Sequence, residues 1–316
     1  MKGYAWKSMV ATVLVAQTGA ANAGKAMEQS VQQLLAEADQ TEPPCHLALV
    51  ASCVGIKKIL PVTMSSAARL LPQADHLEVQ INAKHPQGKR RFSVAHEICH
   101  TLLPTYYRTF VDDRFTGQFS NKSEEELLCD IGAASLLMPE SWLRTRTAGV
   151  APGIEALASL SAQFDVSLEA MALRLSELAV WPCGFVFWQE GLRKADQVPL
   201  EQGLLEGFER PVPKPRVHHV YCSSSFATFV PKNKSAPDDS LVAACFQSEQ
   251  STVGVDVFDF GKGPLPFYCE HLYAPYKPGE MTVPRVISVL MAAQPQAGSP
   301  VEVPSSQTIS ERLFTD

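Results

Sequence analysis

Hydrophobic side chains recur at helical spacing along the first half of the chain. Apolar residues three or four positions apart predict amphipathic helices in four stretches, 26–38, 45–54, 90–103 and 123–138. Between the second and third of these lie two short apolar stretches, IKKILPV (56–62) and HLEVQIN (76–82). The second alternates apolar and polar positions, as a strand with one buried face does, and we expect both to be strands.

The predicted helix 90–103 carries an apolar stripe at the helical period, formed by Phe92, Ala95, Cys99 and Leu102. Pro104 ends this helix, because proline cannot continue the backbone hydrogen bonds. The next helix is predicted to begin with Ser123 as its N-cap and to end at Pro139. Its acidic first turn suits the positive end of a helix dipole.

Residues 154–179 predict two helices joined by a tight turn at Phe164 and Asp165, with Ser167 capping the second helix. This segment has the outline of a helix-turn-helix. Its second helix, however, has Arg174 as its only cation. A helix that reads DNA needs hydrogen-bond donors and positive charge facing the groove. The pattern therefore favours a packing role over direct DNA binding.

After Trp181-Pro182 the pattern changes to short apolar stretches separated by Pro, Gly, Ser and Asn. They read GFVFW, HHVYC, LVAACF, STVGVDVFDF and LPFYCEHLY. Their spacing predicts strands of a mainly β or mixed α/β second domain. The last residues, 294–316, are polar and rich in Pro and Ser, which is typical of a flexible tail.

Charge argues against nucleic acid as a partner. Lys and Arg total 27 against 33 Asp and Glu, which gives a net charge of -6. Proteins that track phosphates need clustered positive charge, because charge neutralisation supplies most of their affinity. The sequence has no apolar stretch of the roughly 18 residues that a membrane crossing requires.

The N-terminal stretch leaves two interpretations open. It has a basic start, a moderately apolar middle and the small residues Ala21-Asn22-Ala23, which together resemble a secretory signal. Polar residues such as Ser8 and Thr12 interrupt the middle and favour an amphipathic leading helix instead. The eight cysteines are scattered and form no CxxC pair, so they favour buried, reduced thiols and a cytoplasmic location.

The stretch RRFSVAHEICH (90–100) contains the strongest chemical signal. His96 and His100 lie one turn apart on the same helical face, where both imidazoles can bind one metal ion. Glu97 then lies beside the metal and can take a proton from water, as in the HExxH motif. The structural alternative is two histidines that share a helix face by chance.

A catalytic zinc needs a third protein ligand and one open position. Glu126 is the candidate third ligand, and Asp130, one helical turn later, can hydrogen-bond a ligating histidine. Glu124 and Glu125 compete for the ligand role, although favourable charge at a helix N-terminus explains both without a metal.

Two motifs together resemble the ImmA/IrrE family of zinc metallopeptidases. RRFSVAHEICH resembles its RF-T/S-x-AHE-x-x-H signature, and EELLCDIGAASLLMP resembles its companion E-x-x-A/C-N/D-x-x-A-A-x-x-L-M-P. The resemblance covers residues 27–180 and implies that His96, His100 and Glu126 bind zinc and that Glu97 is the general base. Cys99 departs from the small residues common in the signature; we expect it to pack closely, although its thiol could also approach Cys129.

The resemblance implies an α+β protein with several parts. Residues 1–26 form an N-terminal extension, 27–150 a gluzincin-like zinc metallopeptidase domain with a small sheet and the HExxH helix, 151–180 a helix-turn-helix-like segment, 181–293 a mixed α/β GAF-like sensor domain and 294–316 the tail. A small molecule or a protein could regulate the sensor domain.

The implied reaction is hydrolysis of a peptide bond. The resemblance implies a regulatory protein as substrate, an Xre-type helix-turn-helix repressor of a stress-response or mobile-element operon. Strand 76–82 is the expected edge on which an extended substrate pairs. Tyr106, Tyr107 or another residue of 105–122 is expected to stabilise the oxyanion. The alternative is a zinc-containing regulator that sequesters a partner without cutting it.

Overall fold

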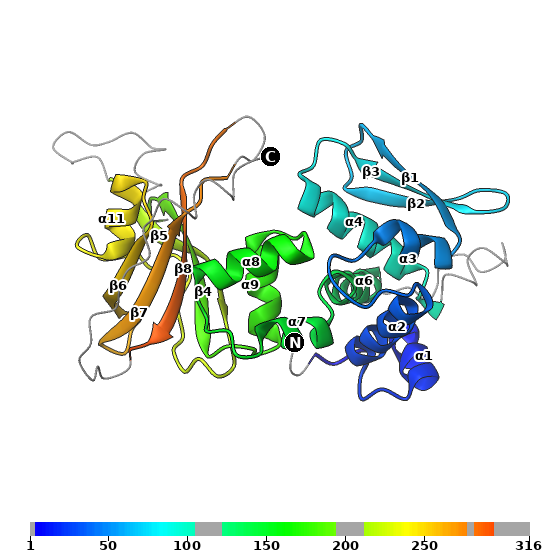
Figure 1. The fold of residues 1–316 in the computed structure, drawn as a ribbon, viewed down its shortest axis with the longest axis horizontal. Helices are drawn as coiled ribbons and strands as arrows, with labels where there is room; N and C mark the ends of the chain where they lie inside the picture. Colours follow the sequence, from blue (N-terminus) through cyan, green and yellow to red (C-terminus); the bar gives the residue numbers. More distant parts are fainter. Residues whose placement is uncertain (1–3, 105–121, 194–211, 277–280, 294–316) are drawn as a thin grey trace. The chain divides into compact units, whose positions relative to one another are not determined.

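The computed structural model describes residues 4–104, 122–193, 212–276 and 281–293 (Figure 1). The chain divides into two compact units. The first comprises Met1–Ala148 and Ser159–Arg174, and the second comprises Gly149–Ala158 and Leu175–Asp316. Among the helices of the described ranges, none combines the length and apolar character that a membrane crossing requires.

The first unit contains a small sheet and a group of helices. Its helices are α1 (Met9–Thr18), α2 (Ala23–Glu37), α3 (Leu47–Cys53), α4 (Gln87–His100), α6 (Lys122–Leu137) and α7 (Glu140–Thr147). Its strands are β1 (Ile56–Val62), β2 (Ala68–Pro72) and β3 (Leu77–Asn82). The elements expected from apolar spacing are present with shifted ends, whereas α7 and β2 were not predicted. Helix α6 already includes Ser123, so this residue is not its N-cap.

The strand order β1-β3-β2 corrects the expectation for the sheet edge. Strand β3 pairs in parallel with β1 and antiparallel with β2, so it is the central strand. The prediction that residues 76–82 offer a free edge is therefore wrong. The cause is β2, whose sequence ARLLP has no clear alternation and gave no strand signal. In the described sheet, β2 itself is an edge strand.

Helix α1 is part of the first unit. It contacts α2 and α6, and its Val10, Ala11 and Leu14 are buried. Ser8 caps it, with its hydroxyl accepting a hydrogen bond from the Ala11 amide at 3.2 Å. Glu124 of α6 accepts the Ser8 amide at 2.8 Å. Burial alone would raise the pKa of Glu124, but these hydrogen bonds outweigh it and lower the pKa.

Helices α4 and α6 pack closely because α6 has a glycine at the contact. A Cβ atom on Gly132 would lie only 2.6 Å from Cys99 Sγ of α4. The buried face of α4 differs from the predicted stripe, since Val94, Ala95, Ile98 and Cys99 are buried. Phe92 and Leu102 of that stripe are only half-buried.

Two helices, α8 (Ile154–Phe164) and α9 (Leu168–Glu177), follow the expected pattern. Asp165 adopts a positive φ of 51° in the turn between them. Ser167 Oγ accepts the Ala170 amide at 3.1 Å and caps α9. Arg174 is buried and donates to the Met138 carbonyl oxygen at 3.2 Å. Its guanidinium group therefore binds a residue of the first unit.

The second unit is built on a five-stranded antiparallel sheet of order β5-β4-β8-β7-β6. Its strands are β4 (Cys183–Gly191), β5 (Lys214–Cys222), β6 (Thr252–Asp259), β7 (Pro264–Tyr273) and β8 (Arg285–Ala292). The prediction that LVAACF forms a strand is wrong, because this stretch begins helix α11 (Leu241–Ser248), which contacts the sheet. Ser240 caps α11, and a short apolar run alone does not separate helix from strand. Strand β8 was not predicted.

Candidate metal centre

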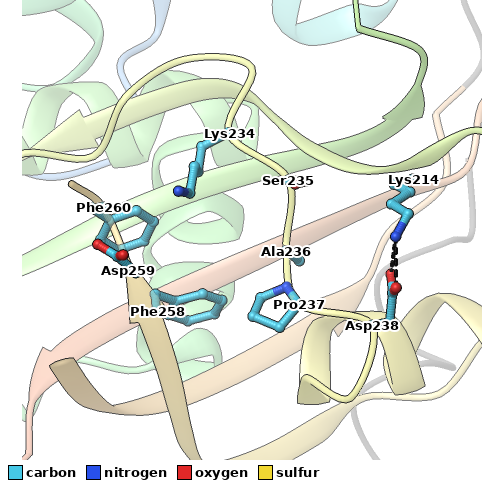
Figure 2. A pocket seen from close by; sticks show the side chains of 9 residues that line it. All are labelled: Lys214, Lys234, Ser235, Ala236, Pro237, Asp238, Phe258, Asp259 and Phe260. Atoms are coloured by element: carbon cyan, nitrogen blue, oxygen red, sulfur yellow. Dashed lines mark hydrogen bonds and ion pairs between the residues drawn. The ribbon is translucent and has the colours of Figure 1, made fainter. Parts of the chain in front are cut away.

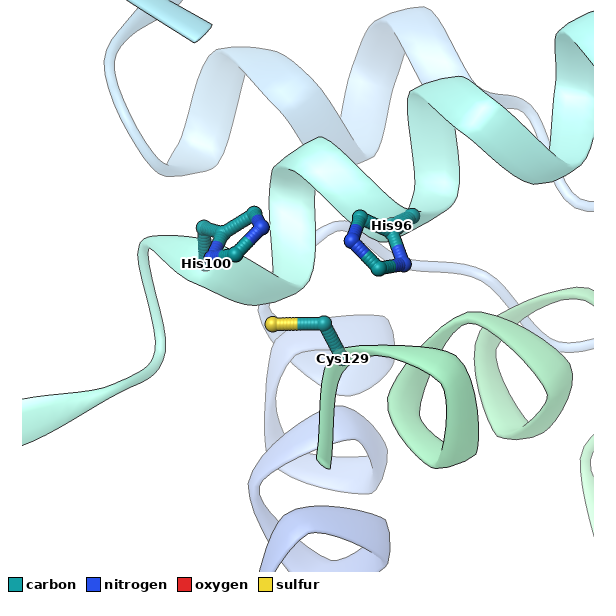
Figure 3. A group of neighbouring side chains, drawn as sticks. All are labelled: His96, His100 and Cys129. Carbon is teal, nitrogen blue, oxygen red and sulfur yellow. The ribbon is translucent and has the colours of Figure 1, made fainter. Parts of the chain in front are cut away.

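Two imidazoles project from the C-terminal part of α4 toward α6 (Figure 3). His96 and His100 are one helical turn apart, and their ring centroids lie 4.9 Å from each other. Both side chains are only partly exposed to solvent. The spacing of HExxH therefore produces the shared face that it predicts.

Glu126 of α6 faces both imidazoles. Its Oε2 lies 3.0 Å from His96 Nε2, and its Oε1 lies 3.8 Å from His100 Nε2. Two ligand atoms that are each about 2.1 Å from a tetrahedral zinc ion lie roughly 3.4 Å from each other. The two observed distances bracket this value. The separations of Glu126 from His96 and His100, the three residues singled out by sequence, are thus compatible with a shared metal ion.

Asp130 supports His96 from the other side of the ring. Its Oδ1 lies 2.9 Å from His96 Nδ1, so each ring nitrogen of His96 faces a carboxylate. Burial alone would lower the pKa of His96, but the Asp130 hydrogen bond and the nearby carboxylates outweigh it and raise the pKa. This arrangement suits an imidazolium, or a neutral ring that donates from Nδ1 and binds a cation through Nε2.

Glu97 and His100 have less polar surroundings. Glu97 is buried, and burial raises the pKa of its carboxyl group, although the charge of His96 and the backbone amide of Leu70 in β2 act in the opposite direction. Burial, followed by the charge of His96, lowers the pKa of His100. A carboxyl group with a raised pKa beside a metal site is suited to accept and return a proton near neutral pH.

A thiol that sequence reasoning did not assign to the site also lies there. Cys129 Sγ and one ring nitrogen from each of His96 and His100 lie within 4.8 Å of one another. Figure 3 shows Cys129 on α6, opposite the two rings of α4. The available signal was its position three residues after Glu126, which places both on one side of a helix.

The other candidates have different positions. Glu124 is committed to the backbone of Lys7 and Ser8 at the start of α1, which removes it from the competition for the ligand role. The oxyanion candidates Tyr106 and Tyr107, with most of 105–122, lie outside the described residues. Among the described residues, the group formed by His96, His100 and Cys129 is the only cluster of its kind, so the histidines and cysteines of the second unit form no second one.

Comparison with known proteins gives a family for the part of the chain that carries this centre. Residues 54–176 match the family model described as the IrrE N-terminal-like domain, peptidase M78. The Radiation response metalloprotease IrrE of Deinococcus deserti is 31% identical over 115 residues, which cover 34% of this chain and 39% of that protein. The protein of the same name from Deinococcus radiodurans is 26% identical over 132 residues, or 40% of this chain and 39% of that protein.

The chain thus matches about two fifths of the length of these relatives. A solved structure of a Mycobacterium tuberculosis transcriptional regulator is similar over 85% of this chain and 76% of that chain, with a TM-score of 0.51. Its sequence identity of 13% limits that likeness to the fold. The matched residues 54–176 contain the histidine pair, Glu97, Glu126 and Cys129. This segment is thus similar to the IrrE N-terminal-like domain of the ImmA/IrrE family.

Proposed function

We propose that the protein is a zinc-dependent endopeptidase that hydrolyses a peptide bond in a regulatory protein. The observation that carries this proposal is the meeting of His96, His100 and Glu126, with Glu97 beside them on α4. The names of the curated relatives, both metalloproteases, support it.

The protein residues have separate roles in the proposed reaction. His96, His100 and Glu126 hold the ion, and Asp130 fixes the His96 ring through Nδ1. A zinc ion held there supplies a Lewis acid and lowers the pKa of a water molecule to about 7. Glu97 takes the proton from the attacking water and returns it to the leaving amine, which its raised pKa favours.

Strand β2 is the proposed docking edge for an extended substrate segment. It is an edge strand of the described sheet, and the amide of its Leu70 reaches the Glu97 carboxylate. A peptide that pairs with an edge strand gains backbone hydrogen bonds without a fixed sequence. Cleavage would then be restricted to extended or exposed segments of a folded protein.

We propose a cytoplasmic Xre-type helix-turn-helix repressor as the substrate, whose cleavage releases a stress-response or mobile-element operon. In this proposal residues 27–150 form the metallopeptidase domain, 151–180 the helix-turn-helix-like segment and 181–293 a GAF-like sensor. The antiparallel sheet with α11 on it supports the sensor assignment.

The sensor proposal includes a cavity for a small effector. A cavity of about 300 Å³ opens in the second unit beside Lys234, Phe258 and Phe260 (Figure 2). Phe258 and Phe260 stack with their centroids 5.3 Å apart. Lys214 at the cavity is paired with Asp238 at 2.6 Å. Aromatic walls suit a planar effector, and Lys234 and Asp259, which also line the cavity, offer a hydrogen-bond donor and an acceptor.

The test compares Glu97→Gln with the unaltered protein. Purified zinc-loaded protein is incubated with helix-turn-helix repressors from the same genome, and fragments are identified by mass spectrometry. We expect Glu97→Gln to keep its zinc and to cut about 10² to 10⁴-fold more slowly. Glu78→Gln is the matched control, because Glu78 and Glu97 are both 9% exposed. If Glu97→Gln and the unaltered protein regulate the repressor equally and neither produces fragments, the sequestering alternative is favoured.

A further inference from the structure

Cys129 has a position that the three-ligand site does not need. It follows Glu126 by three residues, so both project from the same side of α6 toward α4. Its Sγ belongs to the same group of atoms as the ring nitrogens of His96 and His100, all within 4.8 Å of one another (Figure 3). Glu126 faces the same two imidazoles, with its oxygens 3.0 Å from His96 Nε2 and 3.8 Å from His100 Nε2.

Zinc chemistry makes the fourth donor consequential. Cysteine thiolate is a strong zinc ligand at about 2.3 Å, and zinc sites with four protein ligands are closed, whereas catalytic sites keep one position for water. In a tetrahedral site with two nitrogens, one oxygen and one sulfur, no position for water is left. A histidine pair with Glu126 alone leaves that position open.

Exposure separates the two donors on α6. The Glu126 side chain is 58% exposed, whereas Cys129 is fully buried at 0%. The carboxylate can exchange with solvent by rotating its side chain, but the thiol has no solvent position to occupy. A metal ion that binds the two imidazoles therefore has the Cys129 thiol beside it in this arrangement.

A second buried thiol shows that this placement is specific. Cys99 lies on α4 between the two histidines in sequence, yet its Sγ faces Gly132 of α6. It is absent from the group that contains Cys129. Helix α4 thus turns Cys99 into the interhelical contact, while α6 turns Cys129 toward the imidazoles.

We propose that Cys129 is a protein ligand of the metal and that its thiolate closes the resting site. Binding replaces the S–H bond with a sulfur–metal bond and releases the proton to solvent. Hydrolysis then requires the thiolate to leave the metal so that water can enter. This inference rests on the proposed function, because it describes how the same centre is held inactive.

The test uses the full chain loaded with Co²⁺ in place of zinc. A thiolate ligand gives a sulfur-to-cobalt charge-transfer band in the near ultraviolet. We expect this band in the unaltered protein and in Cys99→Ser, and its loss in Cys129→Ser. X-ray absorption of the zinc-loaded, unaltered protein is expected to show one sulfur neighbour at about 2.3 Å, and this measurement needs no variant to fold.

The outcomes separate this inference from the proposed function. A cobalt spectrum without the band, or a zinc shell of nitrogen and oxygen alone, overturns ligation by Cys129 even if Glu97-dependent cleavage is observed. A sulfur shell in the unaltered protein, with no cleavage by either the unaltered protein or Cys129→Ser, supports ligation and removes the peptidase. With both present, Cys129→Ser is expected to cut faster per bound zinc than the unaltered protein; a slower rate overturns the resting-state role.

Discussion

Replacing Gly132 by alanine tests whether the close contact of α4 and α6 builds the metal centre. The new Cβ would lie 2.6 Å from Cys99 Sγ and 3.0 Å from Met27 Sδ. Cys99 and Met27 are both 0% exposed, so neither sulfur can move into solvent. The two helices must therefore separate by a fraction of an ångström, or the side chains must leave their preferred rotamers.

The size of the effect follows from two opposing contributions. Overpacking of a filled core costs about 1 to 3 kcal/mol. Alanine in a helix interior is favoured over glycine by about 0.8 to 1 kcal/mol, which offsets part of that cost. The difference is a loss of about 0 to 2 kcal/mol in the free energy of unfolding, and we expect Gly132→Ala to lie in the upper part of this range because the contacts at Cys99 and Met27 are both buried.

Urea unfolding followed by circular dichroism measures this difference. Gly88→Ala in α4 is the matched control, because a Cβ there would lie 3.5 Å from the nearest atom, the Ser167 amide nitrogen. That distance is ordinary contact, so Gly88→Ala is expected to be neutral or slightly stabilising. A Gly132→Ala protein as stable as Gly88→Ala would refute the packing argument. Zinc affinity, measured in parallel, should fall only in Gly132→Ala.

Three further changes have expected outcomes. Asp130→Ala should weaken zinc binding about 10 to 100-fold by freeing the His96 ring, as measured by chelator competition; unchanged affinity would contradict this role. Burial lowers the pKa of His271 from 6.5 to about 4. The free energy of unfolding should therefore be at its full value above pH 6.5 and fall by roughly 3 kcal/mol as the pH drops toward 4, because the unfolded chain protonates this imidazole first. Unfolding of His271→Gln should show a weaker pH dependence over that range. Arg174→Met should cost about 1 to 3 kcal/mol in thermal unfolding, because it leaves buried acceptors and Glu28 without their donor.

Local spacing accounts for what the sequence predicted well. The pairing of His96 and His100 depends only on the four-residue turn of one helix, and the structure has that helix. The predicted cap at Ser167 also acts over three residues. The meeting of these imidazoles with Glu126, by contrast, requires two helices to pack. The sequence offered Glu126 as a candidate in competition with Glu124 and Glu125, and the family resemblance then implied its role.

Non-local choices account for the errors. Whether a strand lies at an edge depends on every other strand of the sheet, and β2, which pairs with β3, carried no alternation to reveal it. The stretch LVAACF is apolar enough for either a strand or a helix. Its helical form follows from the Ser240 cap and from contacts of α11 with the sheet. A short-range sequence pattern does not reveal such contacts between distant elements.

The neighbouring acids of α6 show how one helix links distant parts of the first unit. Successive residues of an α-helix are rotated by about 100°, so Glu124 and Glu126 project in nearly opposite directions. Glu124 is fixed by the backbone of Ser8 at the start of α1, and Glu126 faces the imidazoles of α4. Gly132 then sets the distance between α6 and α4. The rotation and height of Glu126 thus depend on contacts that begin more than a hundred residues earlier in the chain, because Ser8 and Glu124 are 116 positions apart.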